Sequence, residues 1–135
     1  MVGKIAHIGI AVKDIGASTT LFESLFGMPP DHSEELPDHN VRTAMFRMGD
    51  AAVELTQSLD PESPVARFIA KRGEGVHHVS FVVDDIEKEL MRLKAAGFQL
   101  IDEHSRPGAD GYRVAFLHPK STNGVLVELC EKMTG

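Results

Sequence analysis

The stretch IAHIGIAVKDI, residues 5–15, decides the fold because a second stretch, VHHVSFVVDDI at residues 76–86, aligns with it without a gap. Every aligned pair is 71 positions apart, and the alignment places His7 on His78. Both stretches alternate apolar residues as a half-buried strand does, and both reach an aspartate where a helix can begin. We interpret them as one strand-and-turn unit present twice. The return of an imidazole at the same strand position suggests one metal site assembled from two halves of a single fold.

Each copy continues in the same way after its first strand. An apolar stripe predicts a helix in each copy, and Gly27 and Gly97 follow these helices as stop signals. Three further strands are predicted per copy, at 29–35, 41–48 and 51–58 and at 98–103, 112–118 and 125–131. A short helix is predicted between the copies at about 65–71. The predicted order is β-α-β-β-β twice within one domain, residues 1–135, with module one at about 1–60, a connector at about 61–74 and module two at about 75–135.

Composition limits the classes of partner and location. The chain has 135 residues, of which 42% are hydrophobic and 25% charged, which is typical of a soluble globular domain. A net charge of −6 at pH 7 argues against a nucleic-acid partner. No apolar run approaches the roughly 20 residues that span a bilayer, so no membrane association is expected. The single cysteine, Cys130, fits a reducing compartment, and we expect a cytoplasmic protein.

The last predicted strand of each module carries the tripeptide Val-Glu-Leu, with Glu54 in module one and Glu128 in module two. Strand alternation places each glutamate opposite its apolar neighbours, on the face that also carries His7 and His78. Two imidazoles and two carboxylates suit Co²⁺, Zn²⁺, Ni²⁺ or Mn²⁺. An octahedral ion with four protein ligands keeps two positions for substrate oxygens. We therefore predict that His7, Glu54, His78 and Glu128 bind one catalytic metal ion.

The remaining histidines divide into three groups. His77 has the opposite strand parity from His78, so we predict that it points toward the helix side and is structural or orients a neighbour. His32, His39 and His104 stand in polar, loop-like sequence and are predicted to be solvated. His118 precedes a turn near the last strand, where it could contact a ligand or form a strand-end hydrogen bond.

These motifs resemble those of the vicinal oxygen chelate superfamily and, within it, the methylmalonyl-CoA epimerase family. The resemblance covers nearly the whole chain and is carried by residues 7–12, 63–66, 75–78, 83–86, 116–120 and 124–129. The segment that ends in Glu128, together with the pair His77-His78, discriminates best. The resemblance implies an α+β fold in which the two tandem βαβββ modules form a half-open mixed β-barrel around the metal site, with helices on the outside.

The resemblance also implies an isomerase that interconverts (R)- and (S)-methylmalonyl-CoA. Such an enzyme removes the C2 proton and passes through a metal-stabilised enolate. Co²⁺ is the expected ion, with Zn²⁺, Ni²⁺ or Mn²⁺ as alternatives. Glu128 is expected to serve as both a ligand and one acid/base, although coordination weakens a carboxylate as a base. His118 and Lys120 are the candidate contacts to the CoA thioester; Lys120 could bind the substrate carboxylate or a CoA phosphate, or it could be a solvated lysine. A homodimer is expected.

The chain departs from the family pattern at two positions. Glu54 stands where some relatives carry glutamine, which keeps an oxygen ligand and adds negative charge. Thr43 stands near the position where some relatives carry a glutamate proposed as the second base. A threonine cannot act as a carboxylate base, so the second acid/base stays open: it could be Glu54 by pseudo-symmetry, a water or another side chain. The native metal, the preference between methyl- and ethylmalonyl-CoA, the CoA nucleotide contacts and the pairing of modules within or between chains also stay open.

Two other functions are compatible with the same scaffold. A glyoxalase I-type lactoylglutathione lyase also uses a His/Glu/His/Glu site, and lactoylglutathione formation would distinguish it from an epimerase. A metal-free small-molecule-binding resistance protein needs none of the four ligands. Stoichiometric divalent metal in protein purified without a chelator would argue against that binding protein.

Overall fold

The computed structural model describes residues 2–133, which divide into two compact units. Unit 1 comprises residues 2–7 and 78–133, and unit 2 comprises residues 8–77. Two strands cross this division, β1 (Val2–Ala11) and β5 (Gly75–Val83), so each of them contributes residues to both units. These are the two strands of the sequence repeat.

Unit 2 contains an antiparallel sheet and two helices. After the end of β1 come α1 (Ile15–Phe26), β2 (His32–Leu36), the 3₁₀ turn η1 (Pro37–His39), β3 (Val41–Met48), β4 (Ala51–Ser58) and α2 (Pro64–Arg72). Asp14 caps α1 through a hydrogen bond from the backbone N–H of Ala17, and Gly27 ends it with a φ of 72°. The observed bounds of β3 and β4 are the predicted ones.

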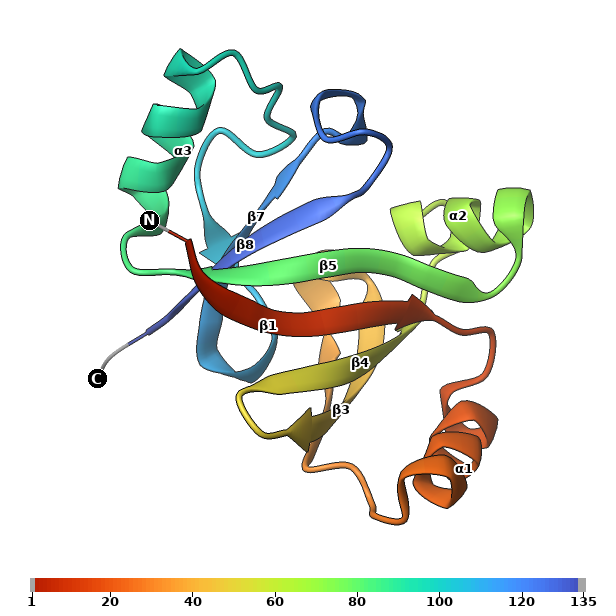
Figure 1. Cartoon of the computed structure of the whole chain (residues 1–135). Coiled ribbons are helices and arrows are strands. Elements are labelled where there is room, and N and C mark those ends of the chain that lie inside the picture. Colours follow the sequence, from red (N-terminus) through yellow and green to blue (C-terminus); the bar gives the residue numbers. More distant parts are fainter. Residues whose placement is uncertain (1, 134–135) are drawn as a thin grey trace. The chain divides into compact units, whose positions relative to one another are not determined.

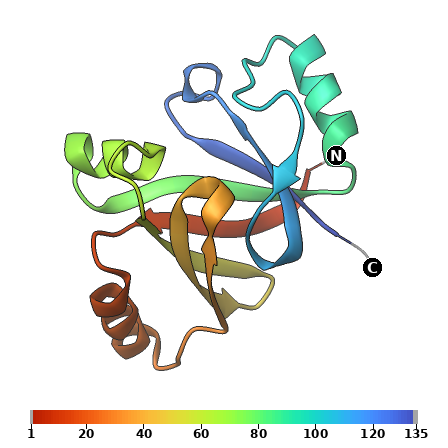
Figure 2. The same cartoon turned by 180° about the vertical axis from the view of Figure 1, so that it is seen from behind.

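The two faces of the β2–β3–β4 sheet have different roles. On one face, Ala44, Phe46 and Leu55 pack against α1 through Ile15 and Phe22. Figure 2 shows helix α1 beside this sheet. Along β3, Val41, Thr43 and Met45 alternate with Ala44 and Phe46 and therefore point to the opposite face. Helix α2 covers only one end of this second face, where Val65 packs with Val41. The rest of this face carries the polar residues Thr43, Glu54 and Thr56 beside the apolar Met45 and Ala52.

Unit 1 repeats the plan with one helix against its sheet. It contains the start of β1, most of β5, α3 (Ile86–Ala95), β6 (Arg106–Pro107), η2 (Ala109–Gly111), β7 (Tyr112–Leu117), η3 (Pro119–Ser121) and β8 (Val127–Lys132). Strand β8 pairs with β5 in parallel and with β7 antiparallel. Leu90 of α3 packs with Ala115 of β7 and Leu129 of β8, so the helix lies on the apolar face of these strands (Figure 1).

The prediction of a regular strand at 98–103 is wrong. That segment makes a single bridge, between Leu100 and Leu117, and the short β6 follows at Arg106–Pro107. The backbone N–H groups of Ile101 and Asp102 both point to the carbonyl of Phe116, and the Asp102 carboxylate accepts from the N–H of Phe116. A side chain thus takes the place of a backbone partner, which interrupts the ladder.

The strands hydrogen-bond in the order β2-β3-β4-β1-β5-β8-β7-β6. Together with the three α-helices of the described residues, this order confirms the predicted α+β class and the two successive βαβββ patterns. Among residues 2–133, the helices are all too short or too polar to cross a bilayer.

Candidate metal centre

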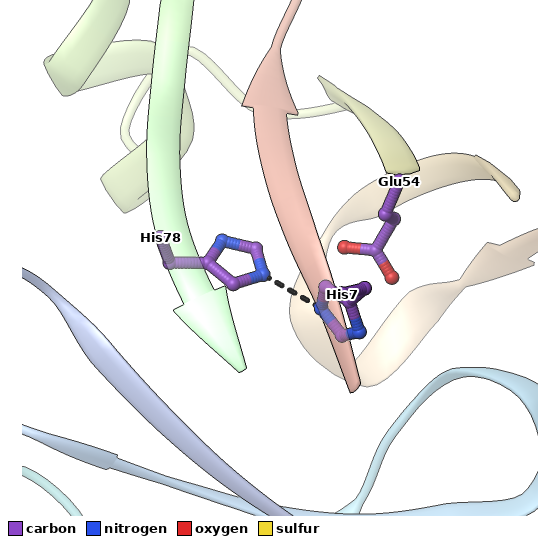
Figure 3. Close-up of side chains that lie close together, drawn as sticks. All are labelled: His7, Glu54 and His78. Carbon is purple, nitrogen blue, oxygen red and sulfur yellow. Dashed lines mark hydrogen bonds between the residues drawn. The ribbon is translucent and has the colours of Figure 1, made fainter. Parts of the chain in front are cut away.

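The two histidines of the repeat lie side by side in unit 1. His7 comes from β1 and His78 from β5, and both are buried. Their Nε2 atoms are 3.0 Å apart, and the rings meet edge to face at 84° (Figure 3). The repeat therefore brings its two imidazoles together, as the 71-residue register predicts.

Glu128 brings a carboxylate to the same place from β8. It lies opposite Ser80 of β5 in the parallel register, and its Oε1 is 3.2 Å from Nε2 of His7. Within residues 2–133, that oxygen receives no hydrogen bond. Burial alone raises the pKa of Glu128, but the imidazoles of His7 and His78 outweigh this effect and lower the pKa to about 2. Glu128 is therefore ionised at neutral pH and offers an oxygen to a cation.

Glu54 is the corresponding glutamate of the first copy. It lies on β4, where it is buried and accepts a hydrogen bond of 3.1 Å from the Thr56 hydroxyl. One ligand atom each from His7, Glu54 and His78 lies within 4.8 Å of the others (Figure 3). The Thr56 hydrogen bond orients this carboxylate, as an outer hydrogen bond commonly does for a metal-binding carboxylate.

The spacing and chemistry of these groups fit a divalent metal ion. Ligand atoms about 2.1 Å from an ion and at a right angle to one another are about 3.0 Å apart. The separations between Nε2 of His7 and its two neighbours, 3.0 Å and 3.2 Å, match this spacing. Two buried carboxylates without a cation would be costly, whereas two neutral imidazoles and two carboxylates offset the charge of a divalent ion.

The predicted substrate contacts lie on the turn after β7. His118 begins η3, and its Nδ1 accepts the N–H of Lys120 at 3.0 Å. This is the strand-end hydrogen bond that was one of the two alternatives for His118. Lys120 is exposed. His77 packs edge to face on Phe68 of α2, in agreement with its predicted orientation toward a helix.

His32 lies on a strand and not in a loop as its polar sequence suggested, while its side chain stays 41% exposed. It lies on β2, with its Nε2 2.9 Å from Oε1 of Glu34, and both side chains are only partly exposed. The signal was present in the alternation of His32, Glu34 and Leu36, which share one strand face. The strand predicted at 29–35 included His32 and Glu34. The sequence did not show with which strand this segment pairs, so the sheet face that carries the two residues could not be predicted.

Comparison with known proteins shows the family to which this chain is related. The model of the Glyoxalase/Bleomycin resistance protein/Dioxygenase superfamily matches residues 6–116. The chain is 40% identical over 128 residues to the uncharacterised protein YqjC of Bacillus subtilis, covering 95% of this chain and 91% of that one. It is 36% identical over 131 residues to the ethylmalonyl-CoA/methylmalonyl-CoA epimerase of Cereibacter sphaeroides, covering 96% and 98%.

A solved structure also relates this chain to the epimerases. A methylmalonyl-CoA epimerase in complex with methylmalonyl-CoA and NH₄⁺ superposes with a TM-score of 0.96 at 31% identity, covering 99% of this chain and 97% of that one. Identity and coverage of this size extend through both βαβββ patterns. The chain therefore belongs to the Glyoxalase/Bleomycin resistance protein/Dioxygenase superfamily and, within it, to the methylmalonyl-CoA epimerase family.

Proposed function

We propose that the chain is a metal-dependent epimerase that interconverts (R)- and (S)-methylmalonyl-CoA. The observation that carries the proposal is the convergence of His7, His78 and Glu128 in a chain that matches named epimerases over nearly its whole length. A relative crystallised with methylmalonyl-CoA supports a CoA thioester as the substrate class. The relatives favour this reaction over that of a glyoxalase I-type lyase.

The reaction requires a proton to leave C2 and a proton to return on the opposite face. The thioester carbonyl acidifies the C2 proton, but the adjacent free carboxylate opposes the formation of negative charge. A divalent ion, when bound, supplies positive charge that neutralises this carboxylate and stabilises the enolate. We assign Glu128 as one acid/base because the family resemblance implies that role and because its buried carboxylate lies beside the two histidines. Burial around the cluster excludes water and strengthens these electrostatic effects.

The proposed metal ligands are His7, Glu54, His78 and Glu128. The 3.0 Å and 3.2 Å separations support the three ligands of unit 1, and the oriented, buried carboxylate of Glu54 supports the fourth. Co²⁺ is the proposed ion, and Zn²⁺, Ni²⁺ or Mn²⁺ would suit the same donor set.

Substrate contacts and assembly complete the proposal. His118 and Lys120 are proposed to contact the substrate from the η3 turn, where the exposed ammonium of Lys120 is available to a carboxylate or phosphate. We further propose a cytoplasmic homodimer whose single domain contains both modules. The edge strands β2 and β6 support self-association because unpaired strand edges readily find partners.

Solvent deuterium exchange tests this function directly. Methylmalonyl-CoA is incubated in D₂O with chelator-treated protein and with the same protein loaded with Co²⁺, and C2 deuterium is measured by mass spectrometry. We expect rapid exchange only in the metal-loaded sample and no lactoylglutathione from the hemithioacetal of methylglyoxal and glutathione. Equal exchange rates in both samples would refute metal dependence. Failure to bind stoichiometric Co²⁺ would favour a metal-free binding protein.

A further inference from the structure

Inversion at C2 removes a proton from one face of a planar enolate and returns a proton to the other, and an acid/base on each face is the simplest arrangement for this; Glu128 is assigned to one face. We propose that Glu34 is the second acid/base and that His32 positions it; this inference rests on the proposed epimerase function. The observation is a carboxylate–imidazole pair on the polar face of the unit 2 sheet, the face that also carries Glu54.

The strand register places Glu34 on that face. Glu34 pairs directly with Thr43 of β3, and Thr43 pairs directly with Thr56 of β4. Directly opposed residues of antiparallel strands point to the same side, so these three form one row across the sheet. Thr56 hydrogen-bonds to Glu54 on the same strand. Glu34 therefore belongs to the row of side chains next to a proposed metal ligand.

The side chain of Thr43 is short, so a carboxylate from the neighbouring strand β2 can reach over it. In the structure the Glu34 carboxylate is turned along β2 to His32. Rotation of this side chain would carry it over Thr43, because neighbouring strands lie only about 4.8 Å apart. Glu34 thus supplies from β2 the carboxylate that β3 lacks.

The geometry of the pair suits proton transfer. Nε2 of His32 is 2.9 Å from Oε1 of Glu34, and the side chains are 41% and 29% exposed, respectively. A half-buried carboxylate held by an imidazole can face a substrate and still exchange its proton with water through the histidine. A fully exposed surface pair would be less well fixed in position.

The other titratable groups on this part of the sheet do not compete for the role. On the polar face, the paired strands β2, β3 and β4 carry His32, Glu34, Arg47 and Glu54 as titratable residues. The guanidinium of Arg47 stays protonated and cannot act as a base. Glu54 is a proposed ligand. Glu35 has the opposite parity and accepts a hydrogen bond from Arg42 on the other face.

The proton balance is as follows for one direction of the reaction. The carboxylate of Glu128 takes the C2 proton as the C–H bond breaks, and the electron pair moves into the thioester to form the enolate. Protonated Glu34 then gives its proton to C2 from the opposite side. Glu128 loses its acquired proton to water, and Glu34 regains one from water through His32. In the reverse direction the two carboxylates exchange roles.

Single-enantiomer exchange in D₂O tests the assignment, because a second base serves only one face. Metal-loaded wild type and Glu34→Gln are compared with each enantiomer of methylmalonyl-CoA, and C2 deuterium and inversion are measured separately. In Glu34→Gln we expect interconversion to fall by at least about 100-fold, within the range of general acid–base catalysis. The enantiomer whose C2 proton faces Glu128 should still exchange, with retention, within about threefold of the wild-type rate.

Controls separate this role from a structural one. Glu35→Gln, on the other face of the same strand, should leave both rates within about twofold. Thermal unfolding reports on folding, and in Glu34→Ala, added formate should restore part of the interconversion if a carboxylate alone is missing. His32→Gln should shift the pH profile of interconversion without changing KM.

Two results would overturn the assignment of Glu34. One is interconversion in Glu34→Gln within threefold of wild type, and the other is an equal slowing of exchange for both enantiomers. Absence of exchange in the metal-loaded wild type would instead overturn the epimerase function itself.

Discussion

Replacement of Thr56 by valine tests whether Glu54 is a metal ligand without touching the ligand itself. The Thr56 hydroxyl donates to Oε1 of Glu54 over 3.1 Å, and both residues are buried. Valine keeps the shape and removes the donor, so the free energy of unfolding should fall by about 1.5–3 kcal/mol, the worth of a hydrogen bond to a charged group. For 135 residues, an unfolding entropy of about 2.1 cal/mol/K per residue converts this loss to a Tm lower by about 5–10 °C.

The metal assay then decides the role of Glu54. If its carboxylate binds the ion, loss of the orienting hydrogen bond should weaken Co²⁺ binding by about 10- to 100-fold, as measured by calorimetry. Thr43→Val is the matched control, since Thr43 is buried directly opposite Thr56 and should change Co²⁺ affinity by less than about threefold. A Thr56→Val protein with a lower Tm but wild-type Co²⁺ affinity would refute the assignment of Glu54 as a ligand.

Three further predictions concern stability and substrate binding. Hydrogen bonds from the hydroxyl and N–H of Ser105 lower the pKa of Glu87 from 4.5. Glu87→Ala should therefore cost about 0.5–1 kcal/mol at pH 7, and denaturation at decreasing pH should show this difference shrink as the pH falls below 4.5. Leu90→Ala should lower the free energy of unfolding by about 2–5 kcal/mol in urea titrations, because Leu90 is 1% exposed. Lys120→Ala should raise KM for methylmalonyl-CoA up to about fivefold with kcat unchanged, and steady-state assays in 0.5 M salt should show the effect shrink.

The sequence alone was sufficient where a pattern is repeated. The 71-residue offset predicted that His7 and His78 would meet, because equivalent positions of two similar modules share a strand face. The bounds of β3 and β4 followed from alternation and from the turn at residues 49 and 50. The place of Glu128 beside the histidines also followed from strand parity. What stays a prediction is the binding of a metal by these side chains.

The strand prediction at residues 98–103 failed for a local reason that composition does not reveal. The apolar alternation there is real, since Phe98 and Leu100 pack on the core cluster of unit 1. Burial of alternate side chains does not require a continuous ladder, however. The Asp102 carboxylate accepts the N–H of Phe116 over 2.8 Å and so replaces a backbone acceptor. An alternating pattern thus predicts which side chains are buried more reliably than it predicts which backbone groups pair.

The position of Glu34 illustrates what only the register of strands can supply. Alternation within β2 indicates that His32 and Glu34 share a face, but it does not tell which face or which partner. The pairing of Glu34 with Thr43 fixes both, and it places a carboxylate beside the position where a threonine replaces the glutamate of some relatives. A comparison made position by position finds a missing base there. A comparison made across the sheet finds a carboxylate one strand away, and for that reason single-enantiomer exchange in Glu34→Gln is more informative than any substitution of Thr43.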